Sequence, residues 1–400
     1  MESKLLSSIK KINLFSALTL ISVCIFPYNW IQQWALIIFF STYIIEFLTE
    51  QKWKNFKWEK SKWTFVLFLV FYSLTIIYIP FEQDTQYLGQ TLEYRLAFLA
   101  IGLIGLFGYN RYYKLDYFIY VIIATSLLLT FYILSNIELI DFIHSSQKND
   151  IFINTRSTLV NTHMMYNYYI NISIVFCYYL YKTKSNKYLR AAAIVIGLFF
   201  YFLMLNSEGR TGFLIANAIV SMILFYTLYQ WNRKIALISI VVVVPVMLVL
   251  AINHPKIQSS EHMQKDLRLS IWHNAIEVIS EKPLLGHGAS SGKIAFIKKA
   301  EGDPILVKIF PDITLAHPHS QYLQMMIEFG VIGISMFLLI NIVPVFLISK
   351  SLRFPFFLFI FINMGQLVTE IYKYAVPIVL FTLWVSVFFN EASRKALKQR

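Results

Sequence analysis

Two histidines flank a proline at residues 317–319, immediately before a long apolar run. Pro318 is suited to the first turn of a helix, where its missing N–H needs no partner. His319 would then lie near the positive end of that helix, which favours a neutral imidazole. A general base near pH 7 requires this neutral form. We therefore predict that His319 is a catalytic base and that His317 lies close to it.

Two glycines follow His319 at helical spacing. Gly330 is eleven residues further on, close to three turns, so the two residues would share a helix face about 16 Å apart. Gly333 would allow another helix to approach closely. Glu328 is a carboxylate inside the apolar run, and we expect it to be protonated or paired within a helix bundle. The spacing thus predicts a base at the water interface with tight packing below it.

Arginines stand at three other predicted helix positions. Arg210 opens an apolar run after the turn-forming residues of NSEG, and a helix N-terminus with a guanidinium is suited to phosphate oxygens. Arg156 precedes another apolar run in a similar way. Arg268 lies one turn before Trp272 on a predicted amphipathic helix. The alternative for each arginine is a position in the membrane interface, in contact with lipid headgroups.

The predicted amphipathic helix lies within residues 254–319, the largest polar region of the chain. Ile271, Ala275 and Val278 recur at helical spacing and define its apolar stripe. Pro283 marks the end of the helix. Such a helix is expected to lie on a membrane surface or over the ends of other helices.

Composition indicates that the elements carrying these residues lie in a membrane. The 400-residue chain is 57% hydrophobic and 14% charged, whereas soluble proteins have about 25% charged residues. The predicted fold class is an all-α polytopic membrane protein with about twelve transmembrane helices. The predicted spans are residues 13–28, 31–48, 63–80, 91–109, 116–136, 160–181, 189–206, 211–229, 235–253, 320–349, 354–370 and 374–390.

Charge predicts the orientation of these spans. Short segments rich in Lys and Arg occur at both ends of the chain and after every second span, as expected for cytoplasmic loops. Both termini are therefore expected in the cytoplasm. The net charge of +13 is a topology signal, and no nucleic-acid partner is expected. Three regions follow: residues 1–253 with spans one to nine, a periplasmic loop at 254–319, and residues 320–400 with the last three spans and a cytoplasmic tail.

Three segments together resemble the O-antigen ligase family. HPHSQYLQMMIEFGVIGISMF resembles its signature of a histidine followed eleven positions later by a Gly–x–x–Gly pair. DLRLSIWHNAIEVISEKPLLGHG looks like its Arg–x–x–x–Trp helix, and SEGRTGFLIA is similar to its Ser–x–x–Arg turn. The resemblance covers mainly residues 206–335.

The resemblance implies a GT-C-like, inverting, metal-independent glycosyltransferase of the bacterial inner membrane. Such enzymes move a glycan from undecaprenyl diphosphate to lipid A–core on the periplasmic side, without a cofactor. His319 would be the base, and Arg210 and Arg268 would bind the diphosphate. Arg156 would be a third ligand, although the Gly-rich stretch that usually follows it in the family is not evident here. Residues near the base or the acceptor would be His317 and Trp272.

Three other functions stay open. An O-antigen polymerase or an O-linked protein oligosaccharyltransferase of the same superfamily would use the same donor chemistry. Metal-using oligosaccharyltransferases are disfavoured because the first outer loop, PYNW, lacks a carboxylate. A non-catalytic transporter of lipid-linked glycans is the alternative from another class, but transporters usually show internal repeats and charges near the membrane centre. No repeat is found in the sequence, and the candidate residues collect on one face of the membrane.

Overall fold

The computed structural model describes residues 4–25, 29–108, 112–135, 163–207, 209–239, 263–310, 312–369 and 375–398, with single positions 241, 245 and 249. These residues form helices, turns and irregular segments without a strand, so the all-α prediction is confirmed for them. The long helices are α1 (Lys4–Val23), α2 (Asn29–Glu50), α3 (Trp63–Ile77), α4 (Thr85–Phe107), α5 (Leu115–Ser135), α8 (His163–Thr183), α9 (Lys187–Asn206), α10 (Arg210–Trp231), α16 (Gln321–Leu347), α17 (Lys350–Gln366) and α18 (Ala375–Lys398). Short 3-10 helices are η1 (Lys52–Asn55), η2 (Lys60–Lys62), η3 (Ile79–Phe81), η4 (Ile313–Leu315) and η5 (Leu367–Thr369).

Nine helices within the described residues are long and apolar enough to cross a membrane, and they coincide with nine of the predicted spans. The prediction at 160–181 is met by α8, a helix of 21 residues that is less apolar because it carries several tyrosines and asparagines. The prediction at 354–370 corresponds to α17, which has 17 residues. The predicted span at 235–253 lies largely outside the described residues. The protein is therefore a polytopic helical membrane protein.

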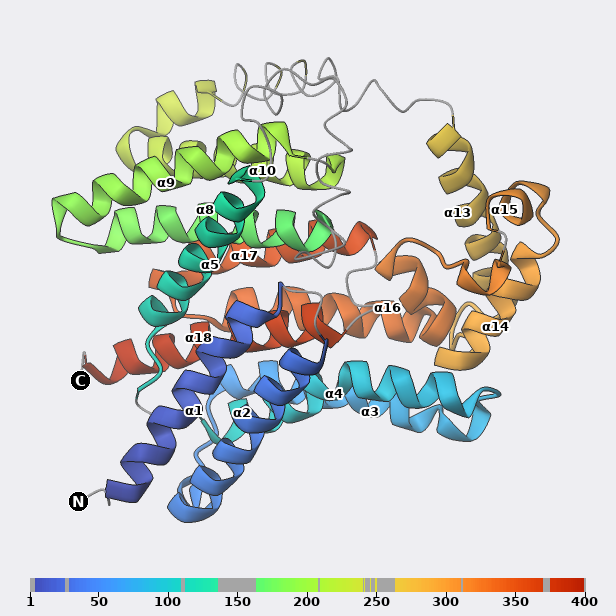
Figure 1. Cartoon of the computed structure of the whole chain (residues 1–400), viewed down its shortest axis with the longest axis horizontal. Helices are drawn as coiled ribbons and strands as arrows, with labels where there is room; N and C mark the ends of the chain where they lie inside the picture. The colour runs from blue at the N-terminus through green and yellow to red at the C-terminus, as the bar shows by residue number, and fades with distance from the viewer. Residues whose placement is uncertain are drawn as a thin grey trace.

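The long helices run side by side (Figure 1). Contacts join α1 to α2, α3 to α4, α4 to α18, and α8 to α9 and α17. α1 begins and α18 ends at the left of Figure 1. The first and last described helices therefore have their terminal ends on the same side of the bundle.

Three further helices project at the right of Figure 1: α13 (Met263–Glu281), α14 (Ala289–Ala300) and α15 (Pro304–Ile309). The predicted amphipathic helix is confirmed by α13, whose apolar stripe is fully buried at Ile271, Ala275 and Val278. These side chains form a separate small core with Phe296 of α14 and Ile327 of α16. This core fastens the three helices to the beginning of α16.

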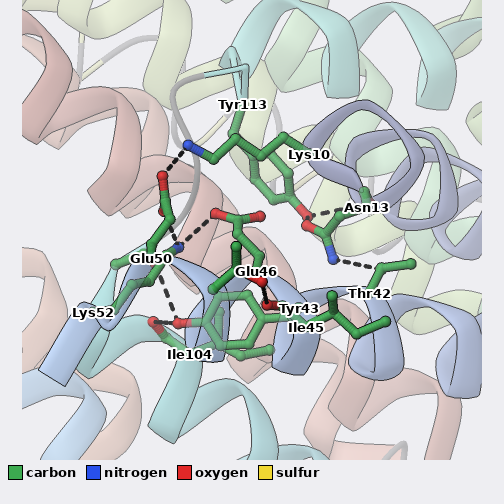
Figure 2. Close-up of polar contacts among 12 residues, drawn as sticks. Lys10, Asn13, Thr42, Tyr43, Ile45, Glu46, Glu50, Lys52, Ile104 and Tyr113 are labelled. Atoms are coloured by element: carbon green, nitrogen blue, oxygen red, sulfur yellow. Dashed lines mark hydrogen bonds and ion pairs between the residues drawn. The ribbon is translucent and has the colours of Figure 1, made fainter. Parts of the chain in front are cut away.

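A largely buried charged network joins α1, α2 and η1 (Figure 2). We call it the α1–α2 cluster and define it as Lys10, Glu46, Glu50 and Lys52. The Lys52 ammonium lies 2.6 Å from Glu46 and 3.8 Å from Glu50, and Lys10 pairs with Glu50. Lys52 also donates to the Gly108 carbonyl at 3.0 Å. The charges of this cluster are therefore paired inside the protein.

Candidate active site

The two histidines lie in a turn that immediately precedes α16. Ser320 is the N-cap and Gln321 is the first helical residue, so the predicted placement of Pro318 in the first turn is wrong. His319 adopts a left-handed backbone with φ of 50°, a conformation in which His is enriched among non-glycine residues. The ring centroids of His317 and His319 are 3.8 Å apart with 51° between the planes. The turn therefore brings the two imidazoles together at the positive end of the helix.

The predicted common helix face of His319 and Gly330 is not formed. His319 precedes the helix, and Gly330 interrupts it with φ of 59° and ψ of −149°. This region is almost confined to glycine, because other side chains collide with the backbone. A Cβ at Gly330 would lie 2.4 Å from the Leu284 carbonyl carbon. The missing side chain of Gly330 therefore makes room for the loop backbone at Leu284, and not for another helix.

Gly333 also differs from its predicted role. A Cβ at Gly333 would lie 2.4 Å from the Phe329 Cβ and 2.8 Å from the Met325 carbonyl oxygen, both within α16. The close approach thus occurs across the kink of the same helix. A neighbouring helix does not supply these contacts.

The kink at Gly330 binds the loop segment 283–288 through its backbone. A helix break frees carbonyl and N–H groups that must find other partners. Four hydrogen bonds satisfy them: His287 N to Ile327 O at 2.8 Å, Gly288 N to Glu328 O at 2.8 Å, Val331 N to Pro283 O at 2.9 Å, and Ile332 N to Leu284 O at 3.4 Å. The loop that follows α13 is therefore fixed to α16 about three turns below the histidines.

A buried ion pair lies beside this kink. Arg95 of α4 is 6% exposed and pairs with Glu328, which is 2% exposed. Gln324 donates to the other carboxylate oxygen of Glu328 at 2.6 Å, and Arg95 donates to the Thr75 hydroxyl at 3.1 Å. The expectation that Glu328 is paired inside the bundle is confirmed. Its partner could not be identified from sequence, because it lies 233 residues away.

A carboxylate from the loop between α3 and α4 holds the beginning of α14. Glu82 accepts hydrogen bonds from the backbone N–H groups of Ser290 and Ser291, each at 2.9 Å, and from the Ser290 hydroxyl at 2.6 Å. A carboxylate is stabilised at a helix N-terminus by the free N–H groups and the helix dipole. This contact places α14 against the beginning of α4.

A cavity of about 240 Å³ lies between α4, α14 and the beginning of α16. His317 and Pro318 line it on one side, and the Arg95–Glu328 pair lines it on another. Its other polar side chains come from all three helices: Tyr87, Gln90, Thr91, Tyr94, Lys293, Gln321 and Gln324. Sequence reasoning identified the histidines but not this cavity, because its walls come from segments far apart in the chain.

The predicted arginines lie on separate elements. Arg210 is the first residue of α10, as predicted, after the N-cap Gly209 with φ of 95°. Arg268 is exposed on α13. Trp272 is partly buried and packs against the small core that α13 forms with α14, α15 and α16. Neither Arg210 nor Arg268 has a hydrogen bond or ion pair to another residue in the part of the chain that the structure describes. Arg156 lies outside the described residues.

The two helices that carry Arg268 and Arg210 contact different parts of the bundle. α13 contacts α16 directly, whereas α10 contacts α8, α9 and α17. The beginning of α10, which carries Arg210, lies at the end of that helix nearer to α13 (Figure 1). Among the predicted site residues, His317 and His319 lie ring to ring.

Comparison with known proteins identifies the family of this region. Residues 192–338 match the family model described as O-antigen ligase. A Haemophilus influenzae protein described only as uncharacterized is 25% identical over 165 residues, which are 37% of this chain and 40% of that protein. Two proteins named "Putative polysaccharide ligase", from Rickettsia bellii and Rickettsia conorii, are 38% and 40% identical over 71 and 73 residues.

The matches cover only part of each protein. The Rickettsia alignments span 18% of this chain and 17% of each relative. The family match includes Arg210, Arg268 and both histidines, while Arg95 lies outside it. The resemblance predicted from the three motifs is confirmed over this segment, because residues 192–338 match the family model described as O-antigen ligase.

Proposed function

We propose that this protein is an O-antigen ligase that transfers a glycan from undecaprenyl diphosphate to lipid A–core during lipopolysaccharide synthesis. The observation that carries the proposal is the pair of histidines at the beginning of α16, beside a polar cavity and within the matched domain. The reaction would take place on the periplasmic side of the bacterial inner membrane. The charge distribution of the loops supports this orientation, with both termini in the cytoplasm.

His319 acts as the general base in this proposal. It accepts the proton of an acceptor hydroxyl as that oxygen attacks the anomeric carbon of the donor. The bond from the anomeric carbon to the phosphate oxygen breaks, and undecaprenyl diphosphate leaves with the electron pair. This single displacement inverts the anomeric configuration.

The paired rings favour this role for His319. The ring centroids of the two imidazoles are 3.8 Å apart, so His317 lies directly beside the proposed base. The second ring can stabilise the proton that the first accepts.

Arg210 and Arg268 are proposed to bind the donor diphosphate. Negative charge develops on the leaving group, and a guanidinium can accept two phosphate oxygens at once. Both side chains are free of ion pairs within the described residues. They can therefore supply the charge stabilisation that a metal ion supplies in other transferases. Arg156 remains a further proposed ligand of the same group.

Replacement of His319 by Ala tests the base assignment in purified full-length protein. General-base catalysis contributes about 10²–10⁴-fold, so we expect the transfer rate to fall by at least 100-fold with nearly unchanged donor binding. His273→Ala is the matched control, because this histidine is 73% exposed on α13. Full activity of His319→Ala would exclude this residue as the base.

Replacement of Arg210 or Arg268 by Ala tests the diphosphate role. Each change should raise the donor KM or lower kcat at least tenfold, and Lys at either position should restore only part of the loss. Unchanged donor kinetics in both variants would exclude the assignment. Transfer should also continue in EDTA, and strict metal dependence would contradict the metal-free mechanism.

Deletion of the gene in its native host separates a ligase from its alternatives. A ligase defect should leave short lipopolysaccharide, with the full-length glycan still on its lipid carrier. A single glycan unit on the core would indicate a polymerase. Normal lipopolysaccharide would contradict both and favour transfer to protein or transport.

A further inference from the structure

We infer that the cavity between α4, α14 and α16 binds the acceptor: it holds one sugar ring of the acceptor glycolipid, with an anionic substituent of that sugar at Lys293. The inference rests on the proposed ligase function and adds a binding site to it. The cavity has a volume of about 240 Å³. A space of this size can hold one sugar ring.

Gln321 is the first observation that points to a ligand. Its side chain lines the cavity, yet the residue is only 3% exposed. The side chain makes no hydrogen bond to any other described residue. Its polar atoms are accessible from the cavity, so a ligand that enters can form hydrogen bonds with them. An amide has both a donor and an acceptor, and vicinal sugar hydroxyls can pair with both.

Lys293 is the second observation. It lines the same cavity and has no carboxylate partner among the described residues. Its ammonium lies 4.2 Å from the ring centroid of Tyr87, which holds the side chain against the α4 wall. The other two charges of the cavity, Arg95 and Glu328, neutralise each other. The cavity therefore has a net positive charge and favours a sugar that carries a phosphate or a carboxylate.

Aromatic rings supply the third part of the site. Tyr87 and Tyr94 lie on α4 and line the cavity together with the amide and ammonium groups. An aromatic face contacts the apolar C–H side of a sugar ring, while polar groups bind its hydroxyls. The combination of aromatic, amide and cationic side chains matches a charged saccharide better than a purely apolar ligand.

The position of the cavity assigns it to the acceptor rather than the donor. His317 lines it, and the ring of His319, the proposed base, lies against the ring of His317. The acceptor hydroxyl must reach that base to lose its proton. The proposed diphosphate ligands, Arg210 and Arg268, do not line the cavity. A sugar held here can thus present a hydroxyl to the base beside His317.

Gln321→Leu tests the site in full-length protein, with purified lipid A–core as the acceptor. We expect the acceptor KM to rise about tenfold, equivalent to about 1.4 kcal/mol, with kcat within about twofold and the donor KM unchanged. Gln366→Leu is the matched control, because Gln366 is 1% exposed and does not line the cavity. An unchanged acceptor KM, or an equal rise in the control, would overturn the proposal.

Lys293→Met tests the charge. This change should raise the KM for phosphorylated lipid A–core about tenfold and leave the KM for the dephosphorylated acceptor unaltered. A rise confined to the donor KM in either variant would assign the cavity to the donor sugar and refute the inference.

A binding measurement keeps the cavity and the proposed function separate. Labelled lipid A–core is titrated into wild-type protein and Gln321→Leu without donor. Weaker binding to the variant supports the site even if no transfer is detected, in which case only the proposed function fails. Equal binding, together with active transfer by the wild type, would reject the site and leave the ligase function intact.

Discussion

The α1–α2 cluster and the cavity between α4, α14 and α16, here called the outer cavity, both contain buried charged groups. They differ in whether the polar groups are paired within the protein. In the α1–α2 cluster, Lys52 lies between two carboxylates (Figure 2) and also donates a hydrogen bond to the Gly108 carbonyl. In the outer cavity, the Arg95–Glu328 pair is likewise satisfied, but Gln321 and Lys293 beside it have no such partner among the described residues. A network whose charges are all paired within the protein contributes to folding alone. Polar groups without such partners around a cavity can instead bind a ligand.

The two regions should therefore respond differently to substitution. Loss of one partner in the α1–α2 cluster leaves a buried charge uncompensated, so the effect is on stability. Loss of an open group at the cavity removes no internal bond, so the effect is on substrate binding. The predictions below test this difference, beginning with the largest expected effect.

Arg95→Met should affect both stability and transfer. It leaves Glu328 buried beside the cavity without its cation, and a broken buried pair costs about 3–5 kcal/mol. Thermal unfolding in detergent and the transfer rate report the two effects. The double variant Arg95→Met/Glu328→Leu should recover much of the stability, because an apolar pair carries no buried charge. An equally unstable double variant would show that the unpaired carboxylate of Glu328 does not cause the loss of stability in Arg95→Met.

Glu46→Gln should destabilise the protein without altering catalysis. Glu46 is fully buried, and its carboxylate is the nearest partner of Lys52. We expect a loss of about 3 kcal/mol in unfolding free energy, with normal transfer per folded molecule. The control is Glu59→Gln, because Glu59 is exposed and should change stability by less than about 0.5 kcal/mol. A changed acceptor KM in Glu46→Gln would contradict the separation of the two regions.

Sequence reasoning succeeded where the structure depends on local patterns. Hydropathy located nine candidate spans, and the spacing of Ile271, Ala275 and Val278 located α13. It failed where distant segments meet. Arg95 and Glu328 are 233 positions apart, and no local rule pairs them.

The kink at Gly330 shows why the site geometry was harder to predict. Local rules treat a glycine in an apolar run as a position for close helix contact. The kink forms instead because the loop segment 283–288 supplies partners for the freed backbone groups. Likewise, the helix begins after Ser320 and not at Pro318, although the Ser320 side chain makes no capping hydrogen bond. The family motifs were recognised correctly, but the shape of their backbone depends on these long-range contacts.

Gly330→Ala should loosen the loop from α16. The added methyl group would collide with the backbone at Leu284, and the conformation itself costs about 1–3 kcal/mol for a residue other than glycine. We expect a loss of about 2 kcal/mol, with faster hydrogen exchange at Val331 and His287. Gly89→Ala is the matched control, because no heavy atom lies within 4 Å of its added Cβ and it should stabilise α4 slightly. Normal exchange in Gly330→Ala would mean that the loop does not depend on this glycine.

Asp303→Ala should have the smallest effect and should depend on pH. Burial raises the pKa of Asp303, but hydrogen bonds from Ser270, from the Ile305 N–H and from Asn274 outweigh it, and the pKa is lowered overall. A lowered pKa means that the carboxylate stabilises the folded state above its ordinary pKa of about 3.9 and loses this effect as pH falls through the folded-state value.

Loss of this N-cap should cost about 1 kcal/mol near pH 6. The difference in unfolding free energy between wild type and Asp303→Ala should therefore shrink as the pH is lowered below about 4. A difference that stays constant with pH would assign the contribution to packing rather than to the charge. Because Asp303 joins α13 to α15 and does not line the cavity, the acceptor KM should not change. Asp303 would then resemble the α1–α2 cluster, whose charges are paired within the protein and contribute to stability. It would differ from Gln321 and Lys293, which are proposed to bind the acceptor.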